Sequence, residues 1–151
     1  MRSWKLWSAA LIAKLVIVAA AVAPQADGQG HPGGAPRIEI TEVPSYSCGG
    51  VEPLESIAGR VTGVEPKRYR LVIYSLACNG ILYVQPTVAA PFTNLDSDGA
   101  FDSIIHLGTT YYVLLVKADA AFKPKPQMTE AEVPGKGGDI VAVAKVRGRR
   151  K

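Results

Sequence analysis

The chain of 151 residues has few of the side chains that most often carry catalysis or bind metal ions. It holds two histidines: His31 lies in a Gly- and Pro-rich stretch, and His106 lies in an apolar run. A lone histidine in a strand offers no partner for acid–base catalysis and completes no Ser-His-Asp set. The cysteines and histidines also lack the spacing of a zinc site. The sequence therefore predicts no catalytic residue, no metal site and no cofactor.

The sequence also lacks a complete calcium-binding loop. The segment Asp96-x-Asp98-Gly99 has the form of the start of a calcium-binding loop. Such a loop needs a glutamate at its twelfth position, which is Leu107 here. We therefore expect a turn, because Asp and Gly tolerate unusual backbone angles. A looser calcium site is the alternative.

Pairs of carboxylates are present, but without a pattern that marks them as catalytic. Glycoside hydrolases hold two carboxyl groups about 5–10 Å apart. Glu39 and Glu42 lie on one predicted strand, and Asp98 and Asp102 flank a turn. Neither pair differs from ordinary solvated charges, so a glycoside hydrolase is the least favoured function.

Tryptophan is missing beyond the first seven residues, since Trp4 and Trp7 are the only two. Sugar rings stack on exposed aromatic faces, so tyrosine must supply any such surface here. Tyr46, in the loop before Cys48, and Tyr83, after the Asn-Gly turn, are the candidate ligand-binding residues. Packing in the core or on a sheet surface is the alternative for each.

The longest apolar run is too short to span a membrane. It covers nine residues, Leu15–Ala23, whereas a bilayer about 30 Å thick needs about 20 helical residues. Basic residues before it and small residues after it predict a secretory signal peptide at 1–28, followed by a flexible linker at 29–36. The alternative is an uncleaved anchor from Leu6, which would place Lys14 in the bilayer at about 2.5–3.5 kcal/mol. We expect a secreted or periplasmic protein with no transmembrane segment after cleavage.

The net charge of +4 is unevenly distributed. Residues 24–144 hold 9 basic and 13 acidic groups, a net charge of −4, and five basic residues fall in the last seven positions. A domain with a net negative charge does not attract the phosphate backbone of a nucleic acid, so no nucleic-acid partner is expected. Residues 147–151 are expected to form a basic tail, either a solvated end or a contact with an anionic membrane or polysaccharide.

Cys48 and Cys78 lie 30 positions apart. In an oxidising compartment such a pair predicts a disulfide. Closing a loop of this length restricts the unfolded chain by about 3–4 kcal/mol. Two free, partly buried thiols are the alternative, and the argument for a disulfide applies only if the protein is exported.

Short β-branched and aromatic runs, separated by Gly, Pro and Asn, predict a single all-β domain. The run 69–76 is apolar on both faces, which is typical of a central strand. Asn79-Gly80 predicts a two-residue hairpin turn. Tyr111 and Tyr112 must point to opposite faces of a strand, so we expect one in the core and one facing outward. Seven strands are predicted, with spacing suited to a β-sandwich over 37–146: 38–43, 56–62, 69–76, 81–85, 101–107, 110–117 and 140–146.

Five short motifs span most of this domain. They are Ile57-x-Gly59-x-Val61-x-Gly63-Val64, Tyr69-x-Leu71-x-Ile73-Tyr74, Gly80 with Pro86 six places later, Asp98-Gly-x-Phe101, and Ile140-Val-Ala-Val-Ala-Lys-Val146. Together they resemble the secreted immunoglobulin-like β-sandwich modules found beside bacterial glycoside hydrolases. The resemblance implies an immunoglobulin-like or fibronectin-like sandwich of about seven strands with an accessory role, often carbohydrate binding.

The chain departs from that family where sugar binding would be supported. The family tends to place tryptophans after the glycine at the position of Gly80, where this chain has Ile81, Leu82 and Tyr83. We expect a non-catalytic exported module with a polysaccharide as the favoured ligand. The alternative is a structural or interaction module that docks on another exported protein through a sheet edge.

Overall fold

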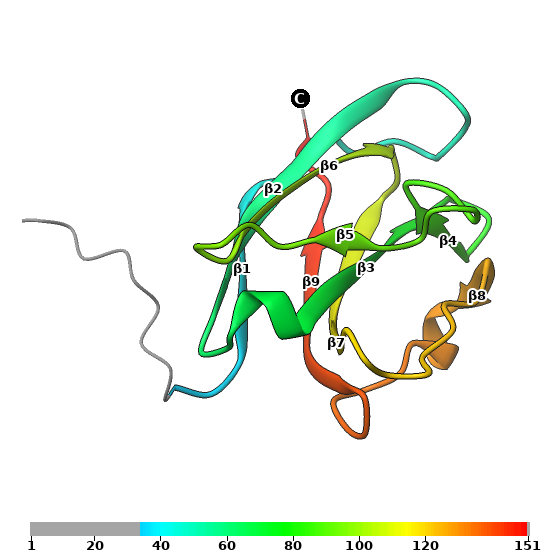
Figure 1. Cartoon of the computed structure of the whole chain (residues 1–151). Helices are drawn as coiled ribbons and strands as arrows, with labels where there is room; N and C mark the ends of the chain where they lie inside the picture. The colour runs from blue at the N-terminus through cyan, green and yellow to red at the C-terminus, as the bar shows by residue number, and fades with distance from the viewer. Residues whose placement is uncertain (1–33, 151) are drawn as a thin grey trace, which may run out of the picture.

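Two antiparallel sheets pack face to face in the computed structural model, which describes residues 34–150 (Figure 1). The all-β sandwich expected from the sequence is confirmed. The predicted signal peptide and most of the predicted linker lie outside the described residues. In chain order, the elements within 34–150 are β1 (Arg37–Glu42), β2 (Leu54–Thr62), η1 (Pro66–Arg68), β3 (Tyr69–Leu76), β4 (Ile81–Gln85), β5 (Thr93–Asn94), β6 (Ala100–His106), β7 (Thr110–Lys117), β8 (Gln127–Thr129), η2 (Glu130–Glu132) and β9 (Ile140–Arg147).

The smaller sheet has the order β1-β2-β6, and the larger has the order β8-β4-β3-β7-β9 with β5 also paired to β3. These are nine strands where the sequence predicted about seven. The two additional strands, β5 and β8, have only two and three residues. Runs this short carry no readable alternation of apolar and polar residues.

β3 is a central strand, as predicted. It pairs with β7 along its whole length, and with β4 and β5 on its other side. The turn into β4 differs from the predicted two-residue type. In this turn Gly80 N–H donates to Ala77 O at 3.1 Å. Among the residues of the turn, only Gly80 has a positive φ, which is 79°. A two-residue turn of the favoured type needs positive φ at both central positions, so the loop instead comprises Cys78–Gly80.

Both faces of the larger sheet are covered by apolar side chains. One cluster lies between the sheets and contains Tyr111, and the other lies on the outer face and contains Tyr112. The expectation that one of these tyrosines faces outward is therefore wrong: their exposed fractions are 0% and 7%. Phe122, Met128 and Val133, which follow β7 in the chain, cover Tyr112 and its neighbours.

A hydrogen bond from the Thr93 hydroxyl to Ser103 Oγ, at 3.2 Å, links β5 to β6 on one side of the sandwich, and backbone hydrogen bonds join the two sheets on the other side. There the chain after β9 continues the packing: Arg149 N–H donates to Pro44 O at 2.9 Å, and Tyr46 N–H donates to Arg149 O at 2.8 Å. The folded domain thus extends through Arg149, whereas the sequence placed a basic tail from Arg147 onward. On the opposite side, β6 pairs only with β2, and no strand joins it to β4.

Within residues 34–150, no helix has the length and apolarity needed to cross a membrane.

Candidate functional site

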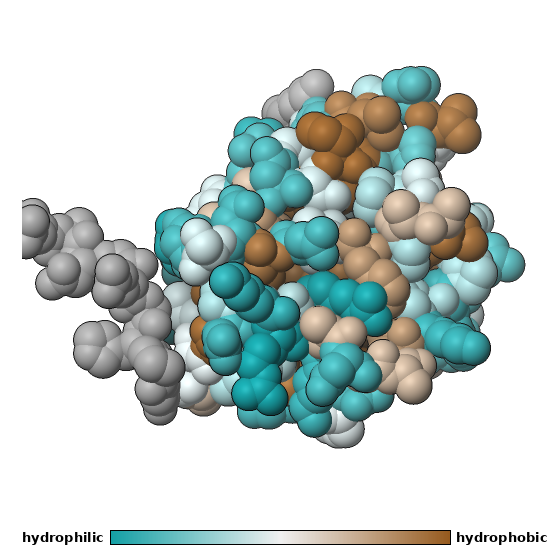
Figure 2. Space-filling model, viewed as in Figure 1, coloured by the Kyte–Doolittle hydropathy of each residue, from teal (hydrophilic) through white to brown (hydrophobic). Residues whose placement is uncertain are grey.

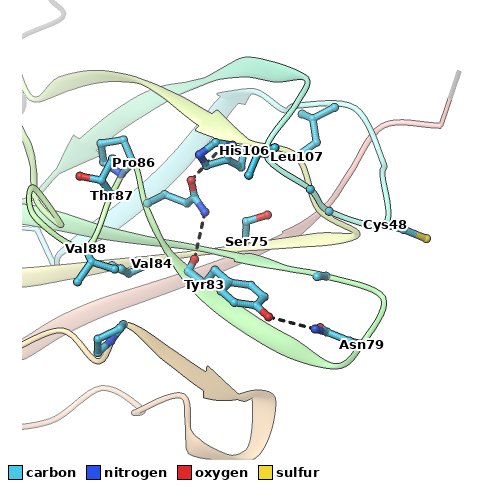
Figure 3. Close-up of a pocket in the computed structure, with 16 residues that line it drawn as sticks. Cys48, Ser75, Asn79, Tyr83, Val84, Pro86, Thr87, Val88, His106 and Leu107 are labelled. Carbon is cyan, nitrogen blue, oxygen red and sulfur yellow. Dashed lines mark hydrogen bonds between the residues drawn. The ribbon is translucent and has the colours of Figure 1, made fainter.

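A pocket of about 630 Å³ opens on the side where β4 and β6 are not joined (Figure 3). Small-molecule sites typically occupy about 300–1,000 Å³. Its walls come from the loop 48–51 after β1, from β4 with residues 86–88 that follow it, and from His106–Leu107 at the end of β6. Ser75, Ala77 and Asn79, at the end of β3 and in the turn after it, and Pro126, before β8, complete the lining. The pocket therefore lies where β4 of the larger sheet and β6 of the smaller sheet are not paired with each other.

The lining of the pocket is mostly apolar and carries no Asp, Glu, Lys or Arg among its 16 residues. Its apolar side chains include Val51, Val88 and Leu107, and its polar side chains include Ser75 and Gln85. Such a lining suits an uncharged ligand, because an ion moved there from water would lose hydration without gaining a counter-charge. No carboxylate pair is available inside it.

Exposed apolar side chains continue around this opening. Val51 and Val88 line the pocket and are 81% and 62% exposed. Leu54 pairs with His106 across the smaller sheet, and both Leu54 and Ile104 are also exposed. Figure 2 shows apolar residues gathered at the upper right of the view, where Figure 1 places the β1–β2 connection and β4.

The predicted disulfide between Cys48 and Cys78 is confirmed, and it fixes one wall of the pocket. It ties the loop after β1 to the β3–β4 hairpin, where Cys78 N–H donates to Cys48 O at 3.0 Å. Gly49 follows at φ +94°, and a Cβ there would lie 2.8 Å from the Ala77 Cβ. Loop and hairpin are therefore in close contact, and only glycine fits between them.

Tyr83 lines the pocket and is 38% exposed. It pairs with Ser75 across β3 and β4, so its ring lies on the sheet face that is turned toward the smaller sheet. Asn79 Nδ2 donates to the Tyr83 hydroxyl at 3.1 Å, and Asn79 Oδ1 accepts from Ile81 N–H at 3.0 Å. The hairpin turn thereby orients the phenol ring at the pocket wall (Figure 3).

Tyr46 occupies a different environment. It is 39% exposed and forms a parallel β-bridge with Gly108. The Cζ atom of the Arg147 guanidinium lies 5.8 Å from the centroid of the Tyr46 ring. It is not among the residues that line the pocket. The two tyrosines selected from the sequence are thus both accessible, but only Tyr83 belongs to the pocket.

Gln85, which the sequence analysis did not select, organises the inner wall. Its side chain is 2% exposed; Oε1 accepts from His106 N–H at 3.0 Å, and Nε2 donates to Tyr83 O at 3.3 Å. The amide therefore links β4 to the end of β6, where no backbone pairing does so. The sequence feature that could have indicated this role is a glutamine in an otherwise apolar strand, directly before Pro86.

The Asp96–Gly99 segment forms the predicted turn. Gly99 N–H donates to Asp96 O at 2.9 Å, and Asp98 pairs with Arg60 at 2.9 Å. The hydrogen bond from Ala100 N–H lowers the pKa of the Asp98 carboxyl. Within residues 34–150, no group of three or more His, Cys, Asp or Glu side chains is arranged to hold a metal ion.

A polar cluster lies on the outer face of the larger sheet, away from the pocket. Tyr112 donates to Glu130, and Lys145 Nζ lies 3.0 Å from Glu130 Oε1. The hydrogen bond from Tyr112 lowers the pKa of Glu130, and burial raises the pKa of Tyr112. These contacts hold η2 against β7 and β9, which is a structural role.

Comparisons with protein-family models, with curated proteins and with solved structures found no match to this chain.

Proposed function

We propose that this protein is an exported, non-catalytic binding module that holds an uncharged sugar in the pocket beside Tyr83. The observation that carries the proposal is the uncharged lining with one accessible aromatic ring. Sugars combine apolar C–H faces, which stack on aromatic rings, with hydroxyl groups that need hydrogen-bond partners. The Cys48–Cys78 disulfide supports export, because disulfides persist in oxidising compartments.

Tyr83 is the proposed stacking residue. Its phenol is held by Asn79 before any ligand arrives, so little side-chain freedom is lost on binding. Tyr46 is not part of this proposed site, because it lies beside Arg147 and outside the pocket.

The test is retention on a panel of neutral cell-wall and storage polysaccharides, followed by titration with the oligosaccharide that is retained. Tyr83→Ala is expected to weaken binding about 3- to 10-fold, the usual contribution of an aromatic contact. Tyr46→Ala is a matched control of equal exposure and is expected to bind as the wild type does. Failure of the wild-type protein to bind any glycan in the panel would overturn the proposal.

A second candidate function, docking on another exported protein, is supported by the edge of β6. Its ends are capped: Ala100 O accepts from Asp96 N–H at 2.8 Å, and the Gln85 side chain caps His106. Backbone N–H and C=O groups alternate in direction along an antiparallel strand. The backbone groups of Asp102 and Ile104 therefore point the same way as those of Ala100 and His106, away from β2. Sheet edges of this kind can accept a strand from a partner.

Cross-linking in the native host with mass spectrometry tests this second candidate. Cross-links between a partner protein and residues beside Asp102 or Ile104 would support it. Recovery of the uncross-linked monomer alone would count against it.

A further inference from the structure

We propose that Arg70 and Asn94, on the outer face of the larger sheet, bind the carboxylate of an acidic side chain of a partner polypeptide. Neither residue lines the pocket beside Tyr83, so the inference does not depend on the sugar-binding proposal. Like the second candidate function it requires a partner protein, but it does not involve the edge of β6.

Arg70 and Asn94 are direct neighbours across β3 and β5, which lie side by side in Figure 1. Directly opposed residues of an antiparallel pair have Cβ atoms about 4.5–5.5 Å apart on one face of the sheet. Arg70 alternates along β3 with Leu71, and it shares the face of Val72, which belongs to the outer cluster. Thr93 points to the other face, where its hydroxyl donates to Ser103. The side chains of Arg70 and Asn94 therefore project together from the outer face.

Phe92 holds the arginine head group in place. The Arg70 Cζ atom lies 3.5 Å from the centroid of the Phe92 ring, and Phe92 packs against the outer cluster. The negative face of an aromatic ring attracts a guanidinium stacked on it. Because all N–H groups of a guanidinium lie in its plane, this stacking leaves them free to bind a ligand. The head group is thus oriented before a ligand arrives.

The N–H groups of Arg70 have no partner within the described structure. No ion pair or hydrogen bond among residues 34–150 involves its side chain, although residues 24–144 include 13 acidic groups. Nε is buried, whereas Nη1 and Nη2 are not. The edge that a ligand can reach is therefore the one formed by Nη1 and Nη2. The exposed Asn94 side chain also makes no hydrogen bond to any described residue.

A carboxylate fits this pair of side chains. A guanidinium presents two parallel N–H groups to the two oxygens of a carboxylate, and such charge-assisted hydrogen bonds are about twice as strong as neutral ones. The Asn94 amide group can donate to the same oxygens. A neutral ligand would gain only the weaker kind of hydrogen bond here.

The position of the two residues favours a partner polypeptide as the source of the carboxylate. A small ligand needs a concave site that covers most of its surface, and Arg70 and Asn94 lie outside the pocket. An acidic side chain that arrives as part of a larger surface needs no such enclosure. Arginine and aromatic residues are enriched at protein interfaces, and here Arg70 and Phe92 are in contact.

An NMR titration of the ¹⁵N-labelled protein tests the inference. The probe is a tripeptide with blocked ends and the order glycine, glutamate, glycine, and its matched control has glutamine at the centre. Glucuronate is the third ligand. The side-chain N–H signals of Arg70 and Asn94 report binding. We expect both to shift with one saturation curve for the glutamate peptide, and an affinity at least about 10-fold lower for the glutamine peptide.

Variants locate the binding site. Arg70→Gln is expected to weaken binding of the glutamate peptide at least about 10-fold, and Asn94→Ala about 2- to 10-fold. Arg70→Lys keeps the charge but loses the paired N–H groups, so its affinity should fall between those of the wild type and Arg70→Gln. Arg68→Gln is the matched control: it removes the same charge from an exposed arginine in η1 and should stay within about twofold of the wild type.

Four results would overturn the inference. Equal binding of the two peptides, or none by either, would show that Arg70 is only hydrated, as would unchanged affinity of a folded Arg70→Gln variant. Equal losses in Arg68→Gln and Arg70→Gln would assign the attraction to net charge. Tighter binding of glucuronate than of the glutamate peptide would assign the site to acidic sugars. If Arg70→Gln does not fold, the responses of the wild-type protein to the three ligands decide.

Discussion

At the scale of single residues, buried phenols join distant parts of the chain. Tyr111 is fully buried; its hydroxyl donates to Ser45 O at 2.7 Å and accepts from Gly108 N–H at 2.9 Å. This contact, from a tyrosine at the start of a strand to the preceding turn, is similar to the tyrosine corner of β-sandwiches. Tyr74 forms a comparable bond to Lys125 O at 3.1 Å, and burial raises its pKa to about 12.

Replacing Tyr111 by Phe is expected to lower the free energy of unfolding by about 1–3 kcal/mol, because two buried backbone groups lose their partner. Urea denaturation measures the change. Tyr69→Phe is the control, since no hydrogen bond between described residues involves the half-buried Tyr69 hydroxyl. A loss at Tyr111 no larger than at Tyr69 would contradict this account of the contact.

Glu132 makes a pH-dependent contribution to stability. Its carboxylate accepts from Thr129 N–H at 2.8 Å and from Lys125 Nζ at 2.9 Å, and the Thr129 hydrogen bond is the largest cause of its pKa falling to about 2. Because the pKa in the folded state lies below the ordinary value of 4.5, the contribution is complete above pH 4.5 and is lost as the pH falls toward 2. The Glu132→Gln variant should therefore show a smaller loss of stability than the wild type between these pH values. Equal losses in the two proteins would show that this carboxylate is not responsible.

At the scale of elements, the longer strands were predictable from the sequence, and the segments that cover them were not. The run 69–76 was correctly assigned to a central strand, because apolar residues on both faces require two covered faces. The burial of Tyr112 was missed, since its cover comes from Phe122 and Met128 beyond the end of β7. Local periodicity carries no information on which later segment returns across a sheet.

The candidate site was predictable only in part, for the same reason. Tyr83 and the Cys48–Cys78 bridge were identified from local signals, namely an aromatic residue beside a turn and a pair of cysteines. Gln85 and Ser75 became apparent only once the strand order showed that β4 and β6 are not paired with each other. Tyr46 was selected on the same local grounds as Tyr83, yet the fold places it outside the pocket.

The loop that carries Cys48 should lose its fixed position without the disulfide. The double variant Cys48→Ser/Cys78→Ser removes a bridge that spans 30 positions, and it should lower the free energy of unfolding by about 3–4 kcal/mol. Guanidinium denaturation with and without a reducing agent gives the measurement. A wild-type protein whose denaturation midpoint does not change on full reduction would contradict the expectation.

At the scale of the whole molecule, the sandwich is closed on one side and open on the other. The closed side depends on the residues after β9, where Gly148 N–H donates to Thr109 O at 3.0 Å and Arg149 exchanges two bonds with residues 44–46. The open side is bridged by the Gln85 side chain and contains the pocket. The pocket therefore lies on the side where no backbone pairing joins the two sheets.

Deleting residues 148–151 is expected to cost about 2–4 kcal/mol of folding stability, because three backbone hydrogen bonds of the closed side are lost. Deleting only residues 150–151 is the control and should change stability little. Thermal unfolding of the three proteins measures the effect. Equal melting temperatures would show that the closed side does not depend on the end of the chain.

The central claim is that an uncharged sugar enters the open side of the sandwich, and chemical-shift mapping of all backbone amides tests it most directly. On addition of a neutral oligosaccharide retained by the wild-type protein, the account predicts that the largest shifts fall on pocket residues such as Tyr83, Val88 and His106. Shifts confined to Tyr46 and β9, to the edge of β6, or absent throughout the chain would contradict it.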